Sequence, residues 1–179
     1  MIYNFSKCFT YLVFACSFFA FTGCDSGEDD VKAEMNAFSF DQQVINKLPL
    51  YDSMVSAIIR NFPSFSKYIR DKDSYHSFRY IPGSEELEVF FKLPPAAAPA
   101  IDPIYNSIGK DHIYGFEIFR DSSVKVFVRT RLTGSKVDIT EFMSYFSGGN
   151  FRKREFPEKD TILDKHWQYW ARFDKRGAF

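Results

Sequence analysis

The segment from residue 124 to 132 constrains the fold more than any other part of this chain. In its sequence, VKVFVRTRL, every second position up to Val128 is a valine. Successive side chains of a β-strand point to opposite faces of a sheet, so this period of two indicates a half-buried strand. The segment 112–119, HIYGFEIF, is also rich in strand-forming residues, and only RDSS separates the two. Together they predict an antiparallel hairpin.

Further strands are predicted by the same reasoning. Residues 75–81 and 87–93 flank the turn sequence PGSEE and predict another hairpin. Two more strand candidates are FRKREF, residues 151–156, and HWQYWARF, residues 166–173.

Helices are predicted where apolar residues recur at spacings of three and four. The longest such stripe begins at Leu48, with Pro49 suited to a first helical turn and Pro63 ending or kinking the helix. Shorter helices are predicted at 64–70, 102–109 and 138–146, whereas the sequence PPAAAPAIDP is interpreted as an extended connection.

Hairpins that alternate with helices predict an α+β fold. We expect an antiparallel sheet built from hairpins, with the helices packed largely on one face. The sequences FRYIPGSEELEVFFK and FEIFRDSSVKVFVR resemble each other. Repeated helix-hairpin units would explain the resemblance, and so would convergence on a generic hairpin pattern, which the poor match of a third unit favours.

The N-terminal region has a different character. Residues 8–23 carry no charge and follow Lys7. A bilayer-spanning helix needs about 20 consecutive apolar residues, so this run has instead the length of the apolar core of a signal peptide. Cys24 comes next. It is followed by a group of acidic residues: Asp25, Glu28, Asp29 and Asp30.

Phe21-Thr22-Gly23-Cys24 resembles the lipobox of bacterial lipoproteins, although Phe21 replaces the usual leucine. The resemblance implies that a signal peptidase recognises Phe21, Thr22 and Gly23 and cleaves before Cys24, whose sulfur carries a diacylglyceryl group. Two or more acyl chains hold a protein stably at a membrane, so the chain would be anchored and would not span. The alternative is an ordinary secretory signal that releases a soluble protein.

The location follows from the same resemblance. The acidic cluster after Cys24 is similar to the tag that sends lipoproteins of Bacteroidota to the cell surface, although Ser26 and Gly27 interrupt it. In enterobacteria, Asp after the lipidated cysteine resembles an inner-membrane retention signal. We expect a bacterial cell-envelope location, with the outer membrane or cell surface favoured over the inner membrane. The whole chain also resembles lipoproteins of Bacteroidota, a likeness that assigns no residues.

The expected organisation has three parts. Residues 1–23 form the signal peptide, residues 24–38 an acidic flexible tether, and residues 39–179 a single α+β globular domain. The mature domain would contain no thiol, since Cys8 and Cys16 lie in the signal peptide. This excludes disulfides, zinc thiolates and cysteine nucleophiles there.

Charge and motifs argue against several classes of function. The 23 Lys and Arg residues balance 23 Asp and Glu residues, so nucleic acid is not an expected partner. The common metal, nucleotide and nucleophile motifs are missing from the sequence, and we expect no cofactor and no metal. These observations favour a non-catalytic protein.

Three histidines are candidates for a catalytic role. His76, His112 and His166 lie at or near strand starts and not at the spacing of metal ligands. Asp111 would point away from His112 on a strand. Asp164 near His166 is the remaining candidate for a general base pair. We expect all three histidines to be ordinary surface or turn residues.

One face of the predicted sheet combines aromatic rings with cations. If every second residue of each strand faces the core, a candidate interaction face lies on the other side, formed by Phe90, Phe127, Arg129, Trp170 and Arg172. Aromatic and arginine side chains are typical of interfaces. The alternative is that a helix or the Pro/Ala segment covers this face. The basic sequence FRKRE is interpreted as a solvated strand face.

Three functions compete. A domain that binds an envelope protein partner is the first hypothesis. A module for a small ligand or glycan, with Trp167, Tyr169 or Trp170 as stacking platforms, is the second. An enzyme with a site built on Asp164 and His166 is the third.

Overall fold

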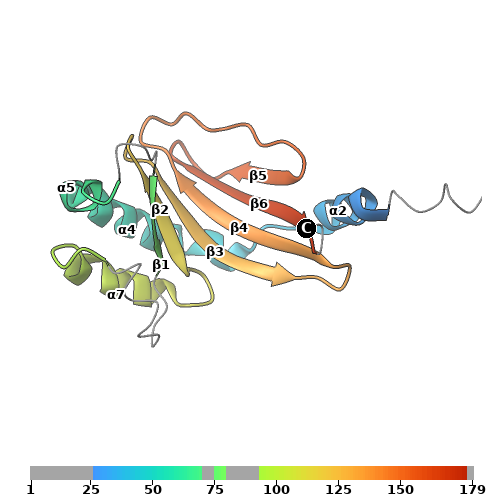
Figure 1. Ribbon diagram of the computed structural model, residues 1–179, viewed down its shortest axis with the longest axis horizontal. Helices are drawn as coiled ribbons and strands as arrows, with labels where there is room; N and C mark the ends of the chain where they lie inside the picture. Colours follow the sequence, from blue (N-terminus) through green and yellow to red (C-terminus); the bar gives the residue numbers. More distant parts are fainter. Residues whose placement is uncertain (1–25, 70–74, 80–92, 177–179) are drawn as a thin grey trace, which may run out of the picture.

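The computed structural model describes residues 26–69, 75–79 and 93–176, and it shows an antiparallel sheet with helices packed against it (Figure 1). The α+β class predicted from the sequence is confirmed. The elements are, in chain order, α2 (Ser26–Ala37), α3 (Gln42–Asn46), α4 (Leu48–Arg60), α5 (Phe62–Ser66), β1 (Tyr75–Arg79), α7 (Ala98–Ile108), β2 (Gly115–Phe119), β3 (Val124–Leu132), β4 (Val137–Tyr145), β5 (Glu158–Ile162) and β6 (Trp167–Lys175).

The described strands form one sheet in the order β1-β2-β3-β4-β6-β5, and every neighbouring pair is antiparallel. The hairpin predicted around RDSS is confirmed as β2 and β3, in which Glu117 lies opposite Lys125. The other predicted hairpin is described only in its first strand, β1, which pairs with β2. Residues 80–92, including Phe90, lie outside the described residues.

The predicted helix over 138–146 is wrong, because this segment is the central strand β4. It pairs with β3 on one side and β6 on the other. Ile139 and Met143 face one side of the sheet and Phe142 the other, and all three are buried. A strand with apolar residues on both faces also satisfies spacings of three and four, which explains the misreading. The third helix-hairpin unit is therefore missing from the described part of the chain.

Other differences concern element boundaries. Residues 151–156 form no strand, and β5 begins two residues later at Glu158. Helix α7 begins at Ala98, within the segment predicted to be an extended connection, and has Pro99 in its first turn. It ends before Gly109, whose φ of +88° is a conformation that favours glycine.

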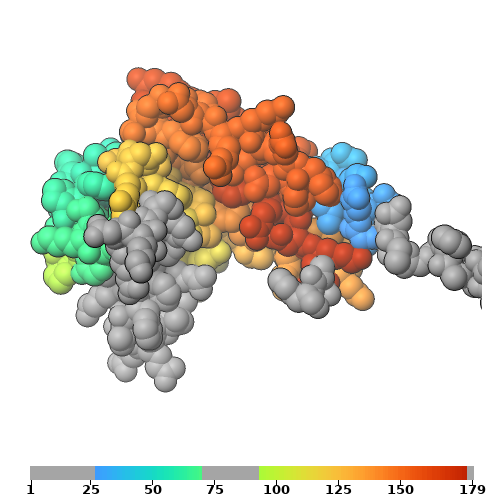
Figure 2. Space-filling view, turned by 45° about the horizontal axis from the view of Figure 1, so that its top comes forward, coloured from blue at the N-terminus to red at the C-terminus, as the bar shows by residue number. Residues whose placement is uncertain are grey.

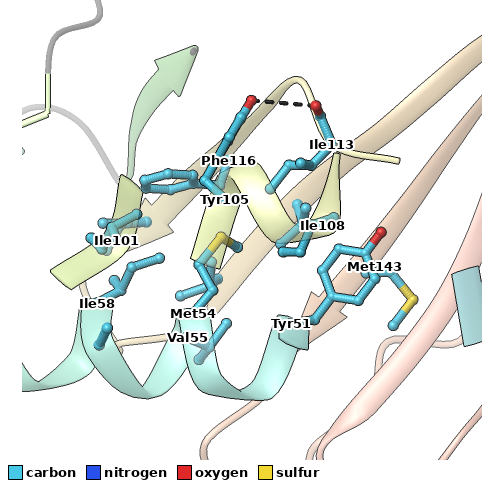
Figure 3. Close-up of a cluster of buried hydrophobic side chains, with 14 of the residues drawn as sticks. Tyr51, Met54, Val55, Ile58, Ile101, Tyr105, Ile108, Ile113, Phe116 and Met143 are labelled. Carbon is cyan, nitrogen blue, oxygen red and sulfur yellow. Dashed lines mark hydrogen bonds between the residues drawn. The ribbon is translucent and has the colours of Figure 1, made fainter. Parts of the chain in front are cut away.

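Helices α4 and α7 cover one face of the sheet, which we call the helix face and define by Val126, Met143 and Tyr169 (Figures 1 and 3). The predicted helix from Leu48 is confirmed as α4. Its buried residues lie on one stripe: Tyr51, Met54, Val55, Ala57 and Ile58. The hydroxyl group of the buried Tyr105 also has a partner, because it donates to the carbonyl of Ile113 at 3.4 Å (Figure 3).

The predicted flexible tether differs most from the structure. Residues 26–37 form helix α2, and Val31, Met35 and Phe38 pack on Val137, Ile139 and Phe173 of the sheet. The spacing of four and three in this apolar series is that of a helix face, hidden among acidic residues. Polar contacts add to the packing: Ser135 Oγ donates to Glu34 at 2.5 Å. Within the described ranges, no helix combines the length and the apolar character needed to cross a bilayer.

Candidate functional site

The sheet face opposite α4 and α7, which we call the outer face, carries a row of aromatic rings. Tyr114, Phe127, Phe142 and Trp170 form this aromatic row, and the last three come from neighbouring positions on β3, β4 and β6. Ring centroids lie 5.5 Å apart for Tyr114 and Phe127, 5.1 Å for Phe127 and Phe142, and 4.1 Å for Phe142 and Trp170. Cross-strand pairing places Phe127, Phe142 and Trp170 side by side on three neighbouring strands.

Cations hold the row in place. The Nζ atom of Lys125 lies 5.0 Å from the ring centre of Phe127 and 5.5 Å from that of Phe142. The guanidinium carbon of Arg154 lies 3.7 Å from the ring centre of Trp170. All three distances are within the range of cation–π contacts. The indole Nε1 of Trp170 donates to Ser144 Oγ at 2.9 Å, which satisfies its only polar group.

The two faces of the Trp170 indole are therefore occupied. Phe142 is stacked on it with an interplanar angle of 16°. The Arg154 guanidinium is so close to the ring centre that it must lie on the opposite side, because both groups do not fit on one side. Trp170 is only 5% exposed.

A cavity of about 690 Å³ lies beside the aromatic row. It is bounded by the β2–β3 turn, the outer face and the segment that follows β4. Its charged and strongly polar lining residues are Glu117, Asp121, Lys125, Asn150, Arg152, Arg154 and Glu158. Its apolar walls include Phe119, Phe146 and Trp170. A volume in this range is typical of small-ligand or peptide side-chain sites.

The charges in this cavity are largely paired. Lys125 Nζ lies 2.5 Å from Glu117 Oε2, and Arg154 Nη1 donates to Glu158 Oε2 at 3.2 Å. The Arg154 side chain is only 9% exposed, and its Nε has no hydrogen-bond partner among the described residues. Burial lowers the pKa of the Arg154 guanidinium, although it stays protonated near neutral pH.

The structure brings together part of the predicted interaction face. Phe127, Trp170 and Arg172 share the outer face, and Arg172 is exposed and paired with Asp174 at 2.8 Å. Arg154, which sequence reasoning placed on a solvated strand, was missed as a site residue. Its sequence neighbours are all charged, and nothing local shows that a tryptophan from β6 lies under it.

Arg129 differs from the sequence-based expectation, because it lies on the helix face. The register shifts between Phe127 and Arg129, where β3 has one residue more than β4. Val128 and Arg129 therefore both oppose Glu141, and the alternation is reversed beyond this bulge. A strict period of two cannot predict such an insertion.

Arg129 belongs to a buried charge cluster formed by Asp41, Arg129, Arg131, Glu141 and Tyr169. Glu141 is fully buried and accepts hydrogen bonds from Arg129 Nε at 2.8 Å, from Arg131 Nε at 2.6 Å and from the Tyr169 hydroxyl. Arg129 also donates to Asp41 at 2.6 Å. Two cations thus face two carboxylates in a compensated arrangement.

The electrostatics of this cluster agree with a structural role. Burial and the negative charge of Glu141 raise the pKa of Tyr169, so this hydroxyl keeps its proton. Burial alone would raise the pKa of Asp41, but hydrogen bonds from Gln43 N–H and from Arg129 lower it more. The sequence contains a signal for the buried position of Glu141. This residue alternates with Val137, Ile139 and Met143, so a carboxylate lies within an apolar series of period two.

Two of the predicted stacking platforms are unavailable to a glycan. Trp167 and Tyr169 lie on the helix face and are 1% and 0% exposed. Trp170 lines the cavity with its edge, while both of its ring faces are covered.

The histidine hypothesis finds no geometric support. Asp164 Oδ1 accepts hydrogen bonds from the backbone N–H groups of His166 and Trp167, at 2.7 and 2.9 Å, and so caps a turn. The His166 ring instead contacts the carbonyl of Phe146 at 3.0 Å. Burial, Lys47 and Arg129 lower the pKa of His112. The side chain of His76 lies outside what the structure describes.

The described residues offer no evident metal site. Within residues 26–69, 75–79 and 93–176, no group of three or more potential ligands is arranged to hold an ion. Residues 21–24, which carry the lipobox resemblance, lie outside the described ranges, so lipidation of Cys24 stays a prediction.

Comparison with protein-family models, with curated proteins and with solved structures found no match. The function must therefore be inferred from the site itself.

Proposed function

We propose that this chain is a lipid-anchored protein of the bacterial envelope whose domain binds a protein partner through the cavity on its outer face, without catalysing a reaction. The anchor rests on the lipobox resemblance at residues 21–24, with Cys24 as the lipidated residue. The outer membrane or cell surface is the favoured location.

One observation carries the binding proposal. The cavity of about 690 Å³ combines apolar walls with exposed hydrogen-bond donors at its rim, the side chains of Asn150 and Arg152. A peptide segment supplies the two things that such a site accepts, namely apolar side chains and backbone carbonyl acceptors.

The competing glycan hypothesis has less support. Sugar rings stack on exposed aromatic faces, and Trp170 offers none because Phe142 and Arg154 cover both sides. A small ligand remains the second candidate, favoured by the volume alone.

Site-specific photo-crosslinking in the native cells tests the proposal. A photo-reactive residue at Asn150, which is exposed and lines the cavity, should give one discrete protein adduct. The same residue at Ser56, exposed on α4, is the matched control and should give none. Arg152→Glu should abolish the adduct formed from position 150. Adducts of equal yield from both positions, or an adduct indifferent to Arg152→Glu, would argue against a partner at this cavity.

The anchor has a separate test. Cys24→Ser cannot form the thioether, so this variant should lose palmitate labelling and membrane association while its domain still folds. Palmitate labelling that survives the substitution would show that the anchor proposal is wrong.

A further inference from the structure

The position of helix α2 sets how close the domain lies to its lipid anchor. Cys24 precedes Ser26, where α2 begins, by two residues, which span at most about 7 Å. Val31 of α2 is 5% exposed, and Lys159 Nζ donates at 3.0 Å to the carbonyls of Met35 and Phe38. The lipid is thus attached next to a docked helix. This reasoning rests on the proposed lipidation of Cys24.

The docking also determines which end of the sheet lies near the lipid. A Cβ placed on Gly27 would lie 2.3 Å from Lys175 Nζ, so the first turn of α2 contacts the end of β6. Lys175 is paired with Val137, the first residue of β4. Figures 1 and 2 show α2 at this end of the sheet, on the opposite side of the molecule from α5.

The surface at this end combines an apolar side chain with cations. Leu132, at the end of β3, is 71% exposed. Lys136, Lys175 and Arg176 are exposed at the same end of the sheet, and the N–H of Arg176 donates to the Lys136 carbonyl at 2.7 Å. This combination suits the interface of a bilayer, where apolar side chains enter the headgroup layer and long cationic side chains reach lipid phosphates.

Acidic groups at the same end limit the electrostatic contribution. Asp138 is paired with Arg176 at 2.7 Å, and Glu28 is paired with Lys32 at 2.7 Å. Asp29 is exposed in the first turn of α2. Cations and acids therefore largely offset each other, and the contact should form on neutral as well as on anionic lipid.

We propose that the lipidated protein lies with this end of the sheet, marked by Leu132, Lys136 and Lys175, on the bilayer surface, with Leu132 in the headgroup layer. The cavity then faces away from the membrane. Val137 begins β4 at the membrane end and Tyr145 ends it at the cavity, so the strand holds the cavity up to about 26 Å from the lipid.

Lipid-borne quenching of a single fluorophore tests this orientation. The only cysteine expected in the mature chain is the lipidated Cys24, so Leu132→Cys introduces one labelling site into the full lipidated protein. Ile162→Cys is the matched control, because Ile162 is a 57% exposed aliphatic residue at the cavity end of β5. Both proteins are reconstituted into phosphatidylcholine vesicles that contain a headgroup-level spin-labelled lipid.

The label at position 132 should be quenched at least about threefold more than the label at position 162, because only the former reaches the headgroup layer. A flexible Gly/Ser insertion of about a dozen residues before Ser26 adds about 20 Å of reach and should remove the difference. Tryptophan fluorescence checks that every variant is folded.

The outcomes separate the two proposals. A lipidated, vesicle-bound protein with equal quenching at both positions, or with stronger quenching at 162, would overturn the orientation alone. A chain that carries no lipid would overturn the proposed anchor, and the orientation with it.

Discussion

Glu141 is the side chain whose replacement should affect stability most clearly. Its carboxylate is fully buried and accepts hydrogen bonds from Arg129, Arg131 and the Tyr169 hydroxyl. Glu141→Gln keeps the shape and removes the charge. The amide can accept from fewer donors at once and brings its own N–H groups toward two guanidinium groups.

The expected loss of unfolding free energy depends on which partners Arg129 and Arg131 keep after the substitution. Removing one partner of a buried ion pair costs about 3–5 kcal/mol of unfolding free energy. Two features lower that figure here. Arg129 keeps Asp41 at 2.6 Å, and the Arg131 side chain is 40% exposed and can be hydrated. We therefore expect Glu141→Gln to cost about 2–3 kcal/mol.

The assay is urea unfolding of the purified protein in the Cys24→Ser background, followed by tryptophan fluorescence from Trp167 and Trp170. Glu28→Gln is the matched control. Glu28 also forms an ion pair, with Lys32 at 2.7 Å, but the two side chains are 53% and 54% exposed. An exposed pair of this kind contributes less than about 0.5 kcal/mol.

A Glu141→Gln variant within about 0.5 kcal/mol of the parent would refute the reasoning, because it would mean that burial gives this ion cluster no more weight than a surface pair. A loss that is the same for Glu28→Gln would refute it equally.

Three further predictions concern single contacts. The pKa of Asp41 is lowered in the folded protein, because the effect of its hydrogen bonds outweighs that of burial. The unfolding free energy should therefore fall as the pH drops below about 4. Asp41→Asn, which keeps the helix cap, should make this decline smaller in urea unfolding. Tyr51→Phe removes a partly buried hydrogen bond of 2.6 Å to the backbone carbonyl of His112 and should cost about 1–2 kcal/mol in the same assay. Trp170→Phe leaves Ser144 without its indole donor and uncovers space under Arg154, and should lower the thermal midpoint by several degrees, corresponding to about 1–2 kcal/mol.

Local periodicity predicted the elements that have one buried face. Strand β3 up to Val128 and helix α4 each bury a single stripe, so their periods of two and of three to four are visible in the sequence. In β4 both faces are buried, and the pattern that distinguishes strand from helix is lost there.

The differences at α2 and at Arg129 have another cause. Four of the twelve residues of helix α2 are acidic, and only its contact with Val137, Ile139 and Phe173 makes its short apolar series significant. The bulge at Val128 depends on pairing with β4, which no local sequence pattern encodes. Phe127 and Trp170 were found because they obey strict alternation in their own strands.

The two groups of charges in this domain differ in what they leave available. In the cluster around Glu141, cations and carboxylates form ion pairs with each other inside the protein. These ion pairs connect Asp41 to the sheet, which is a structural role. In the cavity, by contrast, the side chain of Arg152 is exposed at the rim, where a partner can reach it. Substitutions should therefore separate the two roles. Glu141→Gln should lower the unfolding free energy and leave crosslinking from position 150 intact in the folded fraction, whereas Arg152→Glu should abolish the crosslink and change stability by less than about 0.5 kcal/mol. If Arg152→Glu lowered stability as much as Glu141→Gln, the cavity charges would be structural as well, and the binding proposal would lose its basis.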